Sequence, residues 1–300
     1  MVHQKAHEKR AGEAGGKARG EGTTQPGFKL WKLRHKPLSP ISLGKGRIVL
    51  GCSKYRSMFT LTMEQRLLSL LPVELRQTVE QIETRIGNPI RTYPLTEDCR
   101  RIIGNFPMLN LEQRDGRLFV DVMLPRGDLP PAHAIGHEIL HAKRAVLDSD
   151  PILLTSIASR CVAGAAINND VAHLRVIPEE MGHFREAGPF WKQGFSDMLV
   201  GFASRILNDP DRQAVRNDML RAWLVASVVL PDWDRSDHLK KQLEEIGAGR
   251  DADNLTRVYS NVFKNKIAVL SALVRFHRFE ATGFQTVTVG SDPVPLPSHS

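Results

Sequence analysis

The five residues from His137 to His141 have the types and the spacing needed to hold a metal ion beside a general base. Residues four apart lie on one face of a helix, so His137 and His141 can present two imidazoles to one metal ion. Glu138 lies about 100° around the helix from His137, where its carboxylate can reach a water molecule on that ion. The chemistry that this spacing predicts is hydrolysis by metal-activated water.

The sequence on either side predicts the elements that would position these residues. Pro130 and Pro131 suit the entrance of a helix. Apolar residues then continue to Leu147 with the broad coverage expected of a helix that crosses a core. Upstream, residues 110–114 and 117–124 are predicted to be two strands joined by a tight turn. We therefore expect a β-hairpin that leads into a buried helix.

The motif His-Glu-x-x-His is typical of zinc-dependent peptidases, and a strand leading into its helix resembles the zincin-type peptidases. In those enzymes an edge strand holds the substrate backbone. The resemblance covers about residues 110–180. A helix is predicted over 62–86, with Pro72 as a residue that can split it in two, and a strand is predicted over 90–95. With these elements, the outline is similar to the ImmA/IrrE-type minimal zincin domains of bacteria and mobile elements. No histidine occurs from residue 144 to residue 151, which excludes the metzincin pattern.

This resemblance implies an α+β fold with a small zincin-like core. Such a core has a short mixed or antiparallel sheet, the motif helix and a second helix that carries a ligand. It also implies a zinc metallopeptidase that cleaves a protein or peptide, which in the ImmA/IrrE type would be a single regulatory protein. Zn²⁺ would lower the pKa of its bound water, and Glu138 would be the catalytic residue that moves the proton to the leaving amine. Tyr259, His183 and several arginines stay open as oxyanion stabilisers.

A third metal ligand is needed, because a catalytic zinc usually takes three from the protein. Residues 150–178 are predicted to form one helix that stops at Pro178. Near its end Asp170 and His173 are three residues apart and share a face. We expect His173 to be the third ligand and Asp170 to accept a hydrogen bond from a ligating histidine. The reverse assignment, with Asp170 as the ligand, stays open.

The pair Asn169-Asp170 departs from the pattern of a related group. In thermolysin-like peptidases, the gluzincins, the second helix supplies a glutamate ligand from an Asn-Glu pair. Asn169-Asp170 resembles a shortened form of that pair, but no glutamate stands there. A catalytically inactive zincin-fold protein that binds or regulates a partner is therefore an alternative function.

Other titratable residues nearby are expected to have ordinary roles. His133 precedes His137 by four residues, but it follows the two prolines and is predicted to be a first-turn surface residue. Glu179 and Glu180 follow Pro178 and are expected to be a solvated acidic pair, with the third metal ligand as the alternative role for either. His183 and His277 lack metal-like spacing and are predicted to be structural or exposed.

The composition of the 300-residue chain, 41% hydrophobic and 25% charged, is ordinary for a globular protein. No apolar run is long enough to span a membrane, and no apolar segment near the N-terminus suggests a secretory signal. Cys52, Cys99 and Cys161 show no paired spacing, which argues against a cysteine zinc site and against an oxidising compartment. We therefore expect a cytoplasmic protein without a membrane partner.

Positive charge is concentrated at the N-terminus. Residues 1–36 contain nine Lys and Arg against three Asp and Glu, which is a net +6 of the total +8. This stretch has few apolar residues and is predicted to be disordered. It is interpreted as a solvating arm, with binding of nucleic acid or an acidic partner as the alternative and, with it, a nucleic-acid-associated function.

Four segments follow from these patterns. Residues 1–40 form the basic arm, 41–185 the zincin-like core, 186–285 a mainly helical C-terminal region and 286–300 a tail. Within the last two segments, helices are predicted at 190–207, 212–230, 236–246 and 254–276, a short strand at 286–289 and an unstructured end at 290–300.

Overall fold

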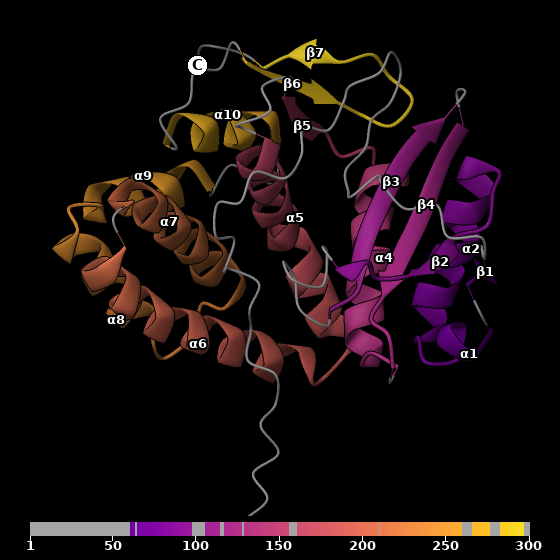
Figure 1. Ribbon diagram of the computed structural model, residues 1–300, viewed down its shortest axis with the longest axis horizontal. Coiled ribbons are helices and arrows are strands. Elements are labelled where there is room, and N and C mark those ends of the chain that lie inside the picture. Colours follow the sequence, from indigo (N-terminus) through magenta and orange to yellow (C-terminus); the bar gives the residue numbers. More distant parts are fainter. Residues whose placement is uncertain are drawn as a thin grey trace, which may run out of the picture.

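The computed structural model combines helices with two small sheets, which confirms the α+β class (Figure 1). It describes residues 61–63, 65–97, 106–114, 117–127, 129–155, 161–209, 211–259, 266–276 and 283–296. The predicted basic arm, Cys52, Cys99 and His277 lie outside the described residues.

The first sheet is mixed and has four strands in the order β1-β2-β4-β3. Their bounds are Leu61–Thr62 for β1, Arg91–Pro94 for β2, Met108–Arg114 for β3 and Arg117–Leu124 for β4. β2 and β4 are parallel, whereas the other two pairs are antiparallel. β3 pairs with β4 in the predicted hairpin, and it lies at an edge of the sheet.

Two helices lie between β1 and β2 in the chain. They are α1 (Gln65–Leu68) and α2 (Val73–Ile86), so Pro72 divides the predicted helix in two as expected. Leu75, Val79 and Ile82 are buried at helical spacing and turn one face of α2 inward. Gly87 then ends the helix with a φ of 68°, a left-handed conformation that glycine adopts without strain.

The motif helix is α4 (Ala132–Val146), and Pro131 stands at its N-cap. It packs against α2, β3 and α5, which explains its broad apolar coverage. Gly136 lies where the Phe184 ring crosses the helix: a Cβ atom there would come within 2.5 Å of Phe184 Cε2. The absence of a side chain at Gly136 therefore permits this close packing.

The predicted single helix over 150–178 is wrong at both ends. Its first residues form strand β5 (Ile152–Thr155), and the helix α5 spans Cys161–His183. The amide of Asn168 exchanges two hydrogen bonds of 2.7 Å with the backbone of Leu153, which holds β5 against α5.

Pro178 does not stop α5 but lies inside it. An interior proline costs about 3 kcal/mol or more, whereas full burial of one large aliphatic side chain contributes about 1.5–3 kcal/mol. Leu174 and Ile177 are both fully buried beside the proline, so tertiary packing outweighs the lost backbone hydrogen bond. The helix thereby continues through Glu179 and Glu180, and Glu180 lies two turns after His173 on the same face.

The remaining helices form the C-terminal half. They are α6 (Ala187–Asn208), α7 (Arg212–Val229), α8 (Ser236–Glu245), α9 (Gly249–Tyr259) and α10 (Lys266–Phe276). α9 begins at Gly249, which is five residues before the helix start predicted at residue 254. Residues 260–265 are not described.

A second sheet joins the C-terminus to β5. β6 (Phe284–Val287) pairs with β5, and β7 (Val294–Pro295) pairs with β6, all antiparallel. β7 lies within the segment 290–300 that was predicted to be unstructured, and that prediction is wrong for these residues. Gly290, with a φ of 84°, lies in the turn that brings the chain back onto β6.

Figure 1 shows α4 and α5 between the first sheet and the helices α6–α10. One hydrophobic cluster extends through all these layers, from Leu75 through Leu174 to Leu273. The expected boundary at residue 185 thus falls inside a continuous core. Among the helices described, none combines the length and apolarity that crossing a bilayer requires.

Candidate metal centre

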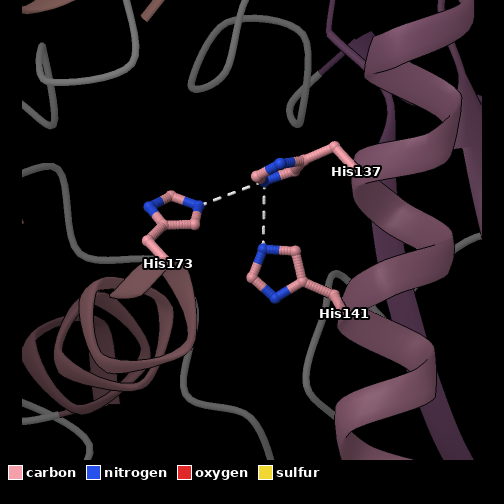
Figure 2. Close-up of side chains that lie close together, drawn as sticks. All are labelled: His137, His141 and His173. Carbon is pink, nitrogen blue, oxygen red and sulfur yellow. Dashed lines mark hydrogen bonds between the residues drawn. The ribbon is translucent and has the colours of Figure 1, made fainter. Parts of the chain in front are cut away.

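Three histidine side chains converge between α4 and α5 (Figure 2). His137 Nε2 lies 3.0 Å from His141 Nε2 and 3.1 Å from His173 Nε2. One ligand nitrogen from each ring lies within 4.8 Å of the others. The structure thus brings together the three histidines expected to be metal ligands.

The two helices place these rings by their spacing and packing. His137 and His141 are one helical turn apart on α4, and His173 reaches them from α5, which packs along α4. Val171 and Leu174, on either side of His173, are buried in the core. α5 is therefore anchored by apolar residues close to the ligand position, as α4 is by Ile139 and Leu140, which are fully buried.

The spacing of the nitrogens suits a metal ion. Around a tetrahedral ion with bonds of about 2.0–2.1 Å, ligand nitrogens lie about 3.3 Å apart. The observed separations of 3.0 and 3.1 Å are close to that value. A set of three imidazoles suits zinc and several other first-row metals, so the residues fit a metal ion without identifying it.

The charges around the rings favour two neutral ligands. Burial lowers the pKa of His141 and of His173 well below the ordinary value, and the neighbouring His137 lowers both further. Burial also acts to lower the pKa of His137, but the hydrogen bond to Glu180 and the negative charges of Glu180 and Glu138 together outweigh it, so that the pKa is raised. His141 and His173 therefore keep nitrogen lone pairs at neutral pH.

Glu138 lies between this cluster and the edge strand. Its Oε2 accepts a hydrogen bond of 2.7 Å from the backbone N–H of Leu109 on β3. Burial raises the pKa of Glu138 to about 7, although His137 and the Leu109 N–H both act to lower it. A carboxyl group with this pKa can both accept and release a proton near neutral pH.

Glu180 differs most from its predicted role as a solvated residue. It is not solvated but fully buried, and its carboxylate accepts three hydrogen bonds. His133 Nδ1 lies 2.9 Å from Oε1, while His137 Nδ1 and Trp191 Nε1 lie 2.8 and 2.9 Å from Oε2. Burial acts to raise its pKa, but these donors outweigh it and lower the pKa to about 2.

The continuation of α5 past Pro178 explains this contact. Glu180 follows His173 by seven residues, or two helical turns, so both side chains face α4. A helix that ended at Pro178, as predicted, would not include Glu180 and would not place it on that face. The spacing of seven from His173, together with His133 four before His137, was the signal available in the sequence.

His133 lies in the first turn of α4, but it is buried with 4% exposure rather than at the surface. Its ring meets the Phe190 ring edge-on at 4.5 Å between centroids, and its Nδ1 binds Glu180. The two prolines before it do not keep it in solvent, because α6 packs over this turn.

Glu179, the neighbour of Glu180, is half-buried and binds α4 differently. Lys143 Nζ lies 2.6 Å from its Oε1, and Arg144 pairs with its Oε2. Glu179 therefore links α4 and α5 through cations rather than through the histidines.

Asp170 is placed away from the histidine nitrogens. Its buried carboxylate pairs with Arg221 of α7, which also binds Asp218 at 3.2 Å. Burial raises the pKa of Asp170 to about 6, while Arg221 acts to lower it. The expected bond to a ligating histidine is made by Glu180 instead, because the carboxylate of Asp170 pairs with Arg221 of α7.

An aromatic wall closes one side of the centre. The Trp191 ring lies 5.3 Å from both the His137 and the His173 ring centroids. Phe190 and Phe195 of the same helix contact Trp191 in turn. Trp191 therefore packs against two of the three histidines, and His137 is buried.

The remaining candidates lie elsewhere or are not described. His183 is half-buried beside Phe184, and the side chain of Tyr259 lies outside the described residues. Lys266 of α10, which the sequence did not suggest, binds Asp150 at 3.3 Å, and its charge acts to lower the pKa of His141.

No protein-family model, curated protein or solved structure matches this chain. What the protein does must therefore be inferred from the geometry of its own residues.

Proposed function

We propose that the protein is a zinc-dependent metallopeptidase with a zincin-like core, acting on a protein or peptide. The observation that carries this proposal is the convergence of His137, His141 and His173 beside Glu138. A zinc ion held by these residues would act as a Lewis acid that activates water and polarises a carbonyl group.

The chain's own residues would then move the proton. Glu138 is half-buried with a pKa of about 7, so its carboxylate can take a proton from water and release it to a leaving amine. The bond from Leu109 holds the carboxylate in place, and Oε1 is the oxygen left to exchange that proton.

The edge strand β3 supports a peptide as the substrate. The N–H of Leu109 is donated to Glu138 and not to β4, so the alternation of an antiparallel pair directs the C=O of Leu109 and the backbone groups of Leu111 away from β4. An extended peptide can pair with such an edge. Its backbone would then run past Glu138.

Two variants test the proposal. Purified protein and its Glu138→Gln variant are each expected to contain one zinc ion per chain by metal analysis. Only the unaltered protein should cleave fluorescein-labelled casein or a set of internally quenched peptides. Loss of about 10³-fold or more in rate is expected, because the proton acceptor is gone.

His141→Ala is the matched metal-site variant and should lose zinc as well as activity. Stoichiometric zinc in His141→Ala would contradict the site. Equal cleavage by the unaltered protein and Glu138→Gln would contradict the catalytic role, and zinc binding without any cleavage would favour an inactive zincin-fold binding protein.

A further inference from the structure

Glu180 connects three helices through one carboxylate. It belongs to α5, and it accepts hydrogen bonds from His133 and His137 of α4 and from Trp191 of α6. It is fully buried, so water does not compete for its oxygens. A buried carboxylate with three N–H donors is held in one orientation and holds its donors in return.

The bond to His137 decides which nitrogen of that ring carries a proton. An ionised carboxylate can only accept, so Nδ1 of His137 must carry the hydrogen. In the neutral ring, Nε2 then has a lone pair, and this is the nitrogen that faces His141 and His173. Without the carboxylate, the proton could lie on Nε2, where it would block a metal ion.

The bond to Trp191 links α6, in the C-terminal half, to the carboxylate of Glu180. Trp191 Nε1 donates to Oε2, the oxygen that also binds His137. The indole ring packs against both His137 and His173. The orientation of His137 therefore depends on α6 as well as on α4 and α5.

We propose that Glu180 is a positioning residue of the metal centre: it holds His137 with its proton on Nδ1 and, through Trp191, couples that ring to α6. This role rests on the metal site proposed above. It assigns a purpose to a buried charge that the peptidase chemistry itself does not use.

The first test compares Glu180→Gln with Glu179→Gln. Glutamine keeps the size of the side chain but loses its charge, and its NH₂ group would face an N–H donor at one of the two oxygen positions. Zinc affinity, measured by competition with a chromophoric chelator, should fall about 10- to 100-fold in Glu180→Gln.

Glu179→Gln is the matched control, because Glu179 also joins α5 to α4 but through Lys143 and Arg144. It should bind zinc within about twofold of the unaltered protein, since no histidine contact changes. Equal losses in the two variants would show a merely structural bridge and overturn the proposal.

A second variant covers the case in which Glu180→Gln does not fold. Trp191→Phe keeps a ring but removes one donor to Oε2. It should weaken zinc binding about two- to tenfold, the effect of one hydrogen bond. Unchanged zinc affinity in Trp191→Phe would overturn the coupling to α6.

The third readout needs no metal. Histidine ¹⁵N–¹H correlation spectra of the full chain in chelator, recorded over a pH series that ends where His137 carries a single proton, should show that proton on Nδ1. Protonation on Nε2 instead would overturn the role of Glu180. A protein that binds no zinc but shows the Nδ1 proton would contradict the metallopeptidase and leave the positioning of His137 supported.

Discussion

At the scale of single residues, two carboxylates in the same site have opposite electrostatic surroundings. Glu138 has one backbone donor at 2.7 Å, and burial raises its pKa to about 7. Glu180 is fully buried, but three N–H donors and the charge of His137 lower its pKa to about 2. The first carboxyl group can therefore exchange a proton near neutral pH, whereas the second stays ionised.

The low pKa of Glu180 predicts how stability depends on pH. A folded pKa of about 2 against an ordinary 4.5 contributes about 3 kcal/mol at neutral pH. Because the folded pKa is depressed, this contribution is complete above pH 4.5 and is lost as the pH falls toward 2. In the presence of a chelator, Glu180→Gln should have a lower free energy of unfolding than the unaltered protein. The difference between the two should decrease as the pH falls from 4.5 toward 2.

Urea unfolding at a series of pH values measures that difference. A gap between the two proteins that stays constant from pH 7 to the lowest accessible pH would contradict the assigned shift, since only the ionised form makes the stabilising bonds.

At the scale of elements, the metal centre depends on how closely α4 approaches its neighbours. A Cβ atom on Gly136 would lie 2.5 Å from Phe184 Cε2 and 3.0 Å from Leu75 Cδ1. Gly136→Ala should therefore destabilise the protein by about 1–3 kcal/mol through overpacking. This outcome is opposite to helix propensity, which favours alanine by about 1 kcal/mol.

Gly201→Ala is the control for that prediction. Gly201 is exposed on α6, and a Cβ atom there meets nothing within 4 Å. It should stabilise the protein by about 0.5–1 kcal/mol. Thermal unfolding of both variants decides the point: a Gly136→Ala protein as stable as Gly201→Ala would show that α4 and Phe184 are not tightly packed.

Asp170 provides a second test, at the junction of α5 and α7. It pairs with Arg221 and lies outside the histidine cluster. Asp170→Asn should therefore keep one zinc ion per chain while losing about 1.5–3 kcal/mol of stability, because the charged hydrogen bond between Arg221 and Asp170 is weakened while the bond to Asp218 remains. Metal analysis and urea unfolding of the same sample separate these effects, and a loss of zinc at unchanged stability would restore Asp170 as a ligand.

At the scale of the whole molecule, the metal centre is not confined to the first half of the chain. Trp191 of α6 binds Glu180, β6 pairs with β5, and the hydrophobic core continues across residue 185. A fragment that ends at residue 185 would expose the faces of α4 and α5 that these elements cover.

Such a fragment should lack a cooperative unfolding transition and should bind zinc more weakly than the full chain. Near-ultraviolet circular dichroism during heating, together with chelator competition, measures both properties. A cooperative transition and unchanged zinc affinity would show that residues 41–185 form an independent domain.

The sequence alone determined the residues with local signatures. The spacing of His137, Glu138 and His141 followed from the geometry of one helix, and the β3-β4 hairpin followed from alternation and turn residues. Pro72 divided the first helices as expected because local sterics decide such a break. His173 was selected by its chemistry and its place on a second helix.

Tertiary structure alone decided which buried groups meet. Local sterics predict that a helix stops at Pro178. The packing of Leu174 and Ile177 outweighs this preference, so α5 continues past Pro178 and places Glu180 on the face toward α4. Glu180, and not Asp170, binds a ligating histidine, because Asp170 pairs with Arg221, fifty-one residues away, and Glu180 is held by contacts that include Trp191, eleven residues away. His137 and His141 thus remain the residues that the helix itself brings together, whereas the proton on His137 is fixed by contacts between helices that no local pattern contains.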